Sequence, residues 1–226
     1  MKKKPHDIHI LIPARQGSVG FPFKNRILLK HTVSIIPEEF LHTVTVSTDD
    51  AEIMQMARDT NIDVLVRPPC LSNDTASMKS VVTHYIQEKK IPDDDIIVVL
   101  YLTYPHRKWM DVIHAILFFI NEMNESAPEP ASMLCKKDVK THPYLCLRET
   151  DDVHGAQIVR HNLYRRQDYP KCFEISHYIC MFKARKIMLL NDNLYNNKTI
   201  YYKIDKDTID VDYPADYPTD LKELTE

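Results

Sequence analysis

The chain has 226 residues, of which 44% are hydrophobic and 27% charged, and its formal net charge is −3. This composition is typical of one globular domain that is long enough to bury a substantial core. The small net charge gives no reason to expect nucleic acid or an anionic membrane as a partner.

The sequence favours a cytoplasmic protein. The start "MKKKPHDIHILIPAR" has no long apolar stretch or small-residue cleavage site of a signal peptide, and no apolar run approaches the roughly 20 residues of a membrane span. The five cysteines are scattered and contain no C-x-x-C pair. Reduced thiols account for this pattern better than disulfides or a zinc site.

Strand and helix patterns alternate along the first half of the chain. β-branched apolar runs predict strands over residues 7–14, 42–48, 64–68 and 95–103. Helical patterns cover residues 50–60, 75–90 and 109–124. The last of these strands is almost continuously apolar, as expected where both faces of a parallel sheet are covered. We therefore predict an α/β fold with a central, mostly parallel sheet.

The second half of the chain is less regular. Strand-like runs at 131–137, 144–149 and 176–182 are separated by polar sequence, and we expect residues 131–165 to form an arm within a single domain covering 1–226. Residues 199–226 predict one or two strands and a closing helix.

The stretch "IPARQGSVGFPFKN", residues 12–25, places two of the three glycines of the chain between Arg15 and Lys24. It follows the first strand, where α/β sheets bind ligands. Backbone N–H groups of such a loop can bind an anion, Arg15 can fork onto phosphate oxygens and Lys24 adds a point charge. The pattern favours a polyphosphate site, although a tight turn with two solvated cations has the same spacing. Neither G-x-G-x-x-G nor G-x-x-x-x-G-K-[ST] is present.

"PARQGSVGFPFKN" resembles the signature P-A-R-x-G-S-K-x-x-P-x-K-N of the acylneuraminate cytidylyltransferases, which include the CMP-sialic acid synthetases. Five further segments resemble the motifs of that family in the same order: "VSTDD", "RPPCLSNDTAS", "LYLTYPHR", "RRQDYP" and "IDVDYPAD". The resemblance spans nearly the whole chain and implies a Rossmann-like nucleotidyltransferase fold, with an arm that packs across a second subunit in a homodimer.

The resemblance also implies roles for individual residues. Arg15 and Lys24 would contact the triphosphate of CTP and act in catalysis with Asp212. The implied nucleotide-binding set is Arg15, Gly17, Ser18, Lys24, Asn25, Arg67, Asp74 and Ser77. The implied sugar-acid-binding set is Tyr101, Thr103, Arg107, Arg166 and Gln167.

The resemblance implies that Asp210 and Asp212 hold Mg²⁺, and their spacing in "TIDVDYP" agrees with that role. In a strand, these two carboxylates would share one face, while Ile209 and Val211 would turn into the core. Mg²⁺ prefers such oxygen ligands. The alternative is an exposed acidic strand end.

The sequence departs from the family pattern mainly on the acceptor side. Tyr101 stands where sialic-acid enzymes typically have glutamine, Tyr104 replaces a serine, and "KCFEISHYICMF" carries Glu174, Ser176 and His177 in place of R-P-N-G-A-I-Y. In the loop, Val19 replaces a lysine. These changes favour a CTP enzyme that acts on an unusual sugar acid.

The implied reaction is attack by the anomeric hydroxyl of a 2-keto-3-deoxy sugar acid on the α-phosphorus of CTP, with release of pyrophosphate. No residue of the sequence identifies the base. Two alternatives stay open: CMP transfer to ketodeoxyoctonic acid or another acceptor, and a non-catalytic nucleotide-binding homologue. An NAD-binding domain is disfavoured because its glycine fingerprint is absent.

Overall fold

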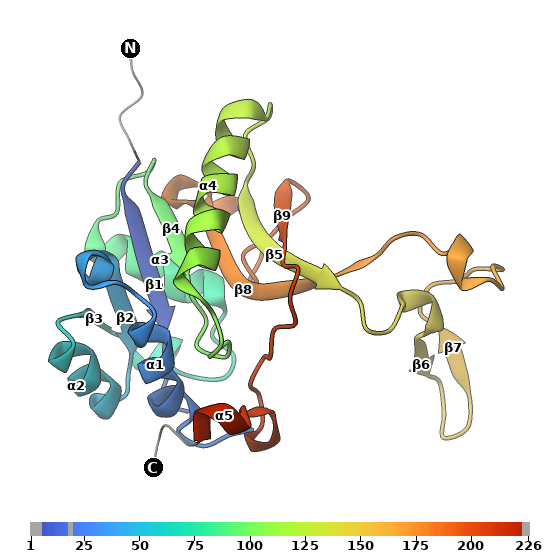
Figure 1. Cartoon of the computed structure of the whole chain (residues 1–226), viewed down its shortest axis with the longest axis horizontal. Helices are drawn as coiled ribbons and strands as arrows, with labels where there is room; N and C mark the ends of the chain where they lie inside the picture. Colours follow the sequence, from blue (N-terminus) through green and yellow to red (C-terminus); the bar gives the residue numbers. More distant parts are fainter. Residues whose placement is uncertain (1–5, 18–19, 223–226) are drawn as a thin grey trace.

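Seven strands form the main sheet of the computed structural model, which describes residues 6–17 and 20–222 (Figure 1). Their order is β3-β2-β1-β4-β8-β5-β9. They are β1 (Ile8–Pro13), β2 (Val44–Thr48), β3 (Asp63–Val66), β4 (Ile96–Val99), β5 (Ser132–Asp138), β8 (Phe173–Lys183) and β9 (Thr199–Lys203). All neighbours pair in parallel except β8, which is antiparallel to both β4 and β5. The predicted mostly parallel α/β sheet is confirmed.

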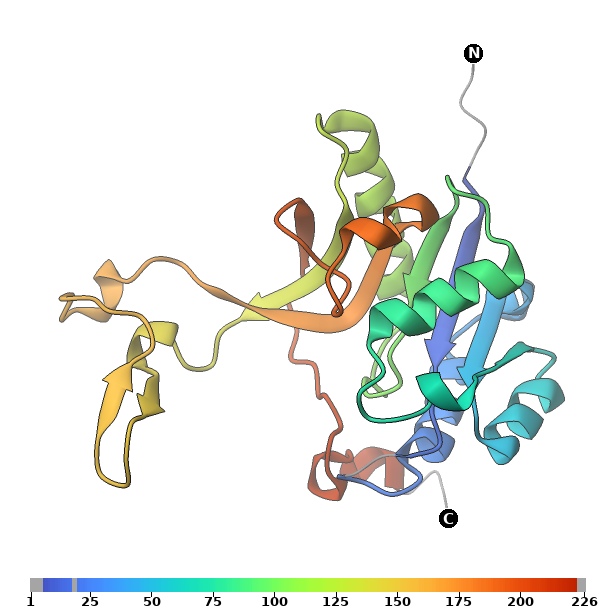
Figure 2. The same cartoon turned by 180° about the vertical axis from the view of Figure 1, so that it is seen from behind.

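Helices cover both faces of this sheet. They are α1 (Lys24–Ser34), α2 (Ala51–Asp59), α3 (Met78–Lys89), α4 (Trp109–Glu125) and the short α5 (Thr219–Lys222). One core cluster joins α1, α2 and α4 to the sheet, and a second joins α3 to the opposite face (Figures 1 and 2). Along β4, Ile96 and Val98 belong to the first cluster and Ile97 and Val99 to the second. This two-sided burial explains why the strand is continuously apolar.

Local signals in the sequence set the starts of two helices. Asp50 caps α2, since its Oδ1 accepts a hydrogen bond from the Glu52 N–H at 2.9 Å. Ser77 caps α3, with its Oγ accepting from the Ser80 N–H at 3.1 Å. Each cap satisfies a backbone donor that has no partner within its helix.

Residues 139–172, called the arm below, leave the sheet between β5 and β8 (Figures 1 and 2). The arm holds a small sheet of β6 (Leu147–Glu149) and β7 (Gly155–Gln157). The arm therefore does not have the expected bounds of 131–165. Residues 132–138 pair within the main sheet as β5, and the projecting segment continues to residue 172.

Aromatic and imidazole rings pack the inside of the arm. Tyr144 stacks on His161 with ring centroids 4.2 Å apart, and both rings contact Tyr169. His142 contacts Tyr144 and Tyr169. These few large rings bury apolar surface in a segment too small for an aliphatic core.

Residues 204–213, called the strap below, run from β9 towards α5 without forming a strand (Figure 1). The predicted strand around Asp210 and Asp212 is therefore wrong. Val211 is fully buried, as expected, but Ile209 is 41% exposed rather than turned into the core. The strap hydrogen-bonds to loops instead of a ladder: the Val211 N–H donates to the Thr103 carbonyl at 2.8 Å.

Among the described residues, no helix combines the length and the apolar character that crossing a membrane requires.

Candidate functional site

The candidate site lies beyond the carboxyl ends of β1, β2 and β4. The loop after β1 is fixed to β2, because the Ala14 N–H donates to the Ser47 carbonyl and the Gln16 N–H donates to Asp49 Oδ1, both at 2.9 Å. The strap crosses the same edge and bonds to the loop after β4 through Val211 and Thr103. This is the edge at which ligands bind in open α/β sheets.

Lys24 joins the loop to the strap. It is the first residue of α1 and only 7% exposed, and its Nζ donates to the Val211 carbonyl at 2.8 Å and to Asp212 Oδ1 at 3.2 Å. These acceptors offset the cost of burying an ammonium group. An ammonium has three donors, and the described residues supply acceptors for two of them. Among the described residues, the third N–H of Lys24 therefore has no acceptor.

The two glycines of the loop have different surroundings. A Cβ on Gly20 would lie 2.7 Å from the carbonyl oxygen of Asp212 and 3.1 Å from the Tyr213 ring, so only glycine allows the loop to approach the strap. A Cβ on Gly17 would meet nothing within 4 Å. Gly17 therefore borders open space, whereas Gly20 is a packing requirement. Ser18 and Val19 lie outside the described residues.

Arg15, Asn25 and Asp74 lie together beside this loop. The Arg15 guanidinium forms an ion pair with Asp74, and the Asn25 side-chain amide donates to the Arg15 carbonyl at 2.8 Å. Both charged side chains of the pair reach solvent. Arg15 is thus held at the mouth of the loop, where an anion can compete for its guanidinium. Ser77, predicted beside the nucleotide, caps α3.

Arg67 lies buried beneath the loop. Its Nη2 donates to the Ser47 carbonyl at 2.9 Å and its Nε to Ser47 Oγ at 3.3 Å. Burial lowers the pKa of Arg67 to about 10, an effect that the charge of Asp49 opposes and that of Arg15 reinforces. Arg67 stays cationic at neutral pH and adds positive potential below the loop.

The predicted acceptor-side residues of the core lie on the loop after β4, and two residues of this loop contact the strap beside the Lys24 contacts. Tyr104 donates its hydroxyl hydrogen to Asp210 Oδ2 at 2.9 Å. The Tyr101 ring contacts the His177 ring edge to face, with centroids 5.4 Å apart. Thr103 takes part through its backbone carbonyl. Asp210 and Asp212, two residues apart on the strap, thus contact Tyr104 and Lys24 respectively.

Arg107, predicted as an acceptor-side residue, is 2% exposed. Its Nε donates to the Tyr178 carbonyl at 2.9 Å and its Nη2 to the Tyr101 carbonyl at 2.6 Å. The guanidinium carbon lies 5.7 Å and 5.2 Å from the ring centroids of Tyr104 and Tyr178. Arg107 braces the loop after β4 against β8, and burial lowers its pKa to about 10.

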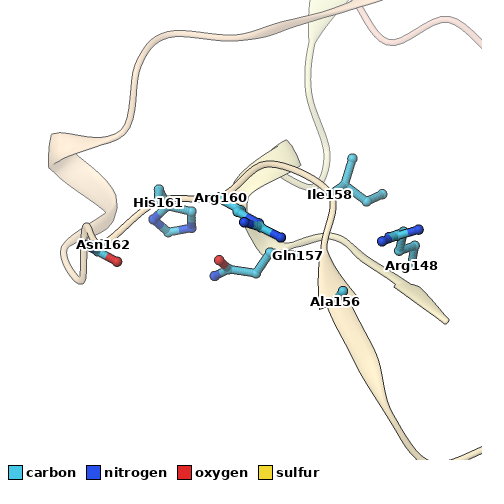
Figure 3. Close-up of a pocket in the computed structure, with 7 residues that line it drawn as sticks. All are labelled: Arg148, Ala156, Gln157, Ile158, Arg160, His161 and Asn162. Carbon is cyan, nitrogen blue, oxygen red and sulfur yellow. The ribbon is translucent and has the colours of Figure 1, made fainter. Parts of the chain in front are cut away.

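Arg166 and Gln167 lie on a 3₁₀ turn of the arm, Arg166–Asp168, and are exposed. Figure 1 shows the arm projecting away from the sheet edge, so the fold of one chain does not bring these residues to Lys24 and the strap. Close to this turn, the arm surface forms an open pocket of about 620 Å³ (Figure 3). Its lining includes Arg148, Gln157 and Arg160. No motif in the sequence singles out these arginines.

Asp210 and Asp212 fit the donor chemistry of Mg²⁺. Each is exposed, and each uses one carboxylate oxygen within the described chain, Asp210 with Tyr104 and Asp212 with Lys24. Residues 6–17 and 20–222 contain no group of three or more His, Cys, Asp or Glu arranged to hold a metal ion. Mg²⁺ commonly takes one or two carboxylates together with substrate phosphates, so a pair of carboxylates is compatible with its coordination chemistry.

The sequence has relatives among known proteins. The chain is 25% identical over 218 residues to an N-acylneuraminate cytidylyltransferase of Streptococcus agalactiae serotype V, which covers 92% of this chain and 51% of that protein. It is 26% identical over 223 residues to post-translational flagellin modification protein B of Campylobacter coli, covering 93% and 92% of the two chains. The chain thus spans about half the length of the first of these relatives.

Solved structures of other proteins have a similar fold. The structure of CMP:2-keto-3-deoxy-manno-octonic acid synthetase complexed with CTP superposes with a TM-score of 0.64 at 14% identity, covering 97% of this chain and 98% of that chain. At this identity the likeness concerns the fold. The model of the cytidylyltransferase family matches residues 9–226, nearly the full length. The chain therefore belongs to the cytidylyltransferase family.

Proposed function

We propose that the protein transfers CMP from CTP to the anomeric hydroxyl of a sialic-acid-like 2-keto-3-deoxy sugar acid and releases pyrophosphate. The observation that carries this proposal is Lys24, a buried cation that joins the loop after β1 to the strap through the Val211 carbonyl and the Asp212 carboxylate, and whose third N–H has no acceptor among the described residues. The family and the names of the relatives support the nucleotide and the class of acceptor. The free cysteines suit a reducing cytoplasm.

In this reaction the protein mainly positions groups and neutralises charge. Lys24 and Arg15 hold the β- and γ-phosphates and stabilise the negative charge of the leaving pyrophosphate. Asp210 and Asp212 would hold Mg²⁺, which supplies charge neutralisation on the phosphates. Tyr104 orients Asp210 through its hydroxyl, and Lys24 orients Asp212.

A panel of sugar acids tests which acceptor the protein uses. Pyrophosphate release from CTP and Mg²⁺ would be measured with N-acetylneuraminic, legionaminic, pseudaminic and ketodeoxyoctonic acids. We expect the highest kcat/KM with one of the nine-carbon acids. Preference for ketodeoxyoctonic acid would favour the alternative acceptor. Release of no pyrophosphate with any acid, despite CTP binding, would favour a non-catalytic nucleotide-binding homologue.

CTP with Mg²⁺ is expected to raise the melting temperature, because a ligand that binds only the folded state stabilises it by mass action. Arg15→Ala should remove most of this shift, since Arg15 lies at the mouth of the loop. Arg58→Ala, on the exposed side of α2, serves as the control and should keep the shift. Differential scanning fluorimetry measures both. Equal stabilisation by NAD, or none by CTP, would contradict the nucleotide assignment.

We further propose that the protein is a homodimer in which each arm reaches the site of its partner. Arg166 and Gln167 cannot serve the site of their own chain in the observed arrangement (Figure 1). Charge supports this pairing: the arm carries six Lys or Arg against four Asp or Glu, whereas the strap carries four Asp against one Lys. The exposed pocket with Arg148 and Arg160 belongs to the same cationic arm (Figure 3).

Arg166→Ala should raise KM for the sugar acid far more than KM for CTP, because a bidentate arginine suits the acceptor carboxylate. Light scattering should report a dimer at micromolar concentration. Mixing Arg166→Ala with Lys24→Met subunits should restore about a quarter of the wild-type rate, as half of the dimers would contain one complete site. A monomer, or no activity in mixed dimers, would contradict an arm that acts on its partner.

A further inference from the structure

Asp111 joins three elements beside the candidate site. It lies in the first turn of α4, and its Oδ2 accepts hydrogen bonds from the Lys206 ammonium and the Tyr178 hydroxyl, both at 2.5 Å, and from the Lys108 N–H at 3.0 Å. Lys206 belongs to the strap and Tyr178 to β8. The side chains of Asp111 and Lys206 are 26% and 35% exposed, so solvent screens their ion pair less than a pair on the open surface. One carboxylate thus connects α4, β8 and the strap.

The strap segment from Lys206 to Asp210 is attached at both ends to the same group of side chains. At its far end, Tyr104 donates its hydroxyl hydrogen to Asp210 Oδ2 at 2.9 Å. The rings of Tyr104 and Tyr178 meet edge to face, with centroids 5.4 Å apart. Because Tyr178 donates to Asp111, which also accepts from Lys206, the side-chain contacts close this segment into a loop.

Few backbone contacts hold this segment. The N–H groups of Ile204 and Val211 donate to carbonyls outside the strap, but residues 205–210 form no backbone hydrogen bond within the part of the chain that the structure describes. Residues 207–209 line a cavity of about 170 Å³ instead of a packed core. The path of the strap before Asp210 is therefore set by side-chain contacts at its two ends and not by a β-ladder.

We propose that the ion pair of Asp111 and Lys206 positions the strap, so that Asp210 and Asp212 lie where both can bind one Mg²⁺. The proposal rests on the proposed function, which gives these two aspartates to the metal. Both are exposed carboxylates that repel each other when no cation lies between them. A strap that is held in place before the metal arrives offsets part of that repulsion. Asp111 and Lys206 are positioning residues, since they act on the metal only through the strap.

The test measures how pyrophosphate release depends on Mg²⁺ in Lys206→Met and Asp111→Asn. Each should raise the Mg²⁺ concentration for half-maximal rate about tenfold, because a site that is formed in fewer molecules binds its ligand more weakly. At saturating Mg²⁺, kcat should stay within about a factor of two of wild type, since the reacting groups are unchanged.

Three further variants show whether the pair acts as a unit. Lys206→Arg keeps the cation and its N–H donors and should restore the wild-type Mg²⁺ dependence. The combined variant Asp111→Asn, Lys206→Met should be no worse than either single variant, because each already breaks the same contact. Lys198→Met, at an exposed lysine just before β9, is the matched control and should behave as wild type.

Two readouts do not require turnover. Hydrogen exchange of the ligand-free protein, followed by mass spectrometry, should be faster over residues 204–213 in Lys206→Met than in wild type, because exchange reports local opening. A titration of protein and CTP with Mn²⁺, followed by electron paramagnetic resonance, should show the same loss of metal affinity. Unchanged exchange in the strands of the main sheet shows that the variants are folded.

The outcomes separate this inference from the proposed function. Wild-type Mg²⁺ dependence and strap exchange in both single variants, or a loss of rate that persists at saturating Mg²⁺, would overturn the positioning role. Additive losses in the combined variant would overturn it as well. If wild type releases no pyrophosphate with any acid of the panel, the proposed function fails, whereas strap exchange and Mn²⁺ binding still decide whether Asp111 and Lys206 position the strap.

Discussion

Lys24→Met is expected to lower kcat for CTP-dependent pyrophosphate release by about 10³-fold, the scale of losing one pre-positioned charge donor at a transition state. Methionine fills similar space but has no charge and no N–H. The change removes the donor that we propose contacts the leaving group and also the link from α1 to Val211 and Asp212. Steady-state pyrophosphate release, measured with saturating CTP, gives the value.

Lys30→Met is the matched control, because Lys30 is an exposed lysine on the same helix. It should leave kcat within about a factor of two, since replacing an exposed side chain that makes none of these contacts has little effect on the protein. Near-normal turnover in Lys24→Met would show that this buried lysine only joins the loop to the strap.

Asp210→Asn and Asp212→Asn are each expected to lower kcat by at least about 100-fold, because an amide is a poorer ligand for Mg²⁺ and cannot supply its charge. Both side chains are exposed, so the melting temperature of the unliganded protein should change little. The Mg²⁺ dependence of pyrophosphate release and a melting curve together separate loss of metal binding from loss of folding.

Asp207→Asn provides the control within the same acidic strap, since Asp207 is an exposed aspartate three residues before Asp210. Its kcat and Mg²⁺ dependence should match those of wild type. If either site variant keeps normal turnover at limiting Mg²⁺, the pair does not form the metal site, and its carboxylates serve only Tyr104 and Lys24.

The strands and helices of the core were predictable from the sequence because the patterns that indicate them are local. The unbroken apolar run of β4 follows from burial on both faces, and Asp50 marks the start of α2 by capping it. The position of the loop after β1, at the edge where open α/β sheets bind ligands, was also predictable, since it follows the first parallel strand. These features depend on neighbours in sequence or on the general form of the fold.

The strap was mispredicted because its partners are distant in sequence. "TIDVDYP" has the alternation of a strand, but the backbone of Val211 bonds to Thr103 and Lys24, and Asp216 accepts from the N–H groups of Asp212 and Tyr213. Loop and side-chain partners replace a β-ladder, and period-two spacing cannot distinguish the two.

The role of Arg107 was similarly hidden. The sequence placed it on the acceptor side, but only the fold shows it enclosed by Tyr104 and Tyr178 and bonded to two carbonyl groups. Arg166 lies on the arm for a comparable reason: the excursion between β5 and β8 begins and ends where Asp138 pairs with Phe173. Such pairing is non-local and leaves no periodic signal.

The central claim, that this sheet edge transfers CMP to a sugar acid, is tested most directly by ³¹P NMR of protein, CTP, Mg²⁺ and the preferred acid. We expect the CTP resonances to be replaced by pyrophosphate and a new phosphodiester resonance in equal amounts, and neither product in the Lys24→Met variant. Formation of CMP monoester and pyrophosphate would instead reveal hydrolysis by water. Unchanged CTP with every acid tested would contradict the account.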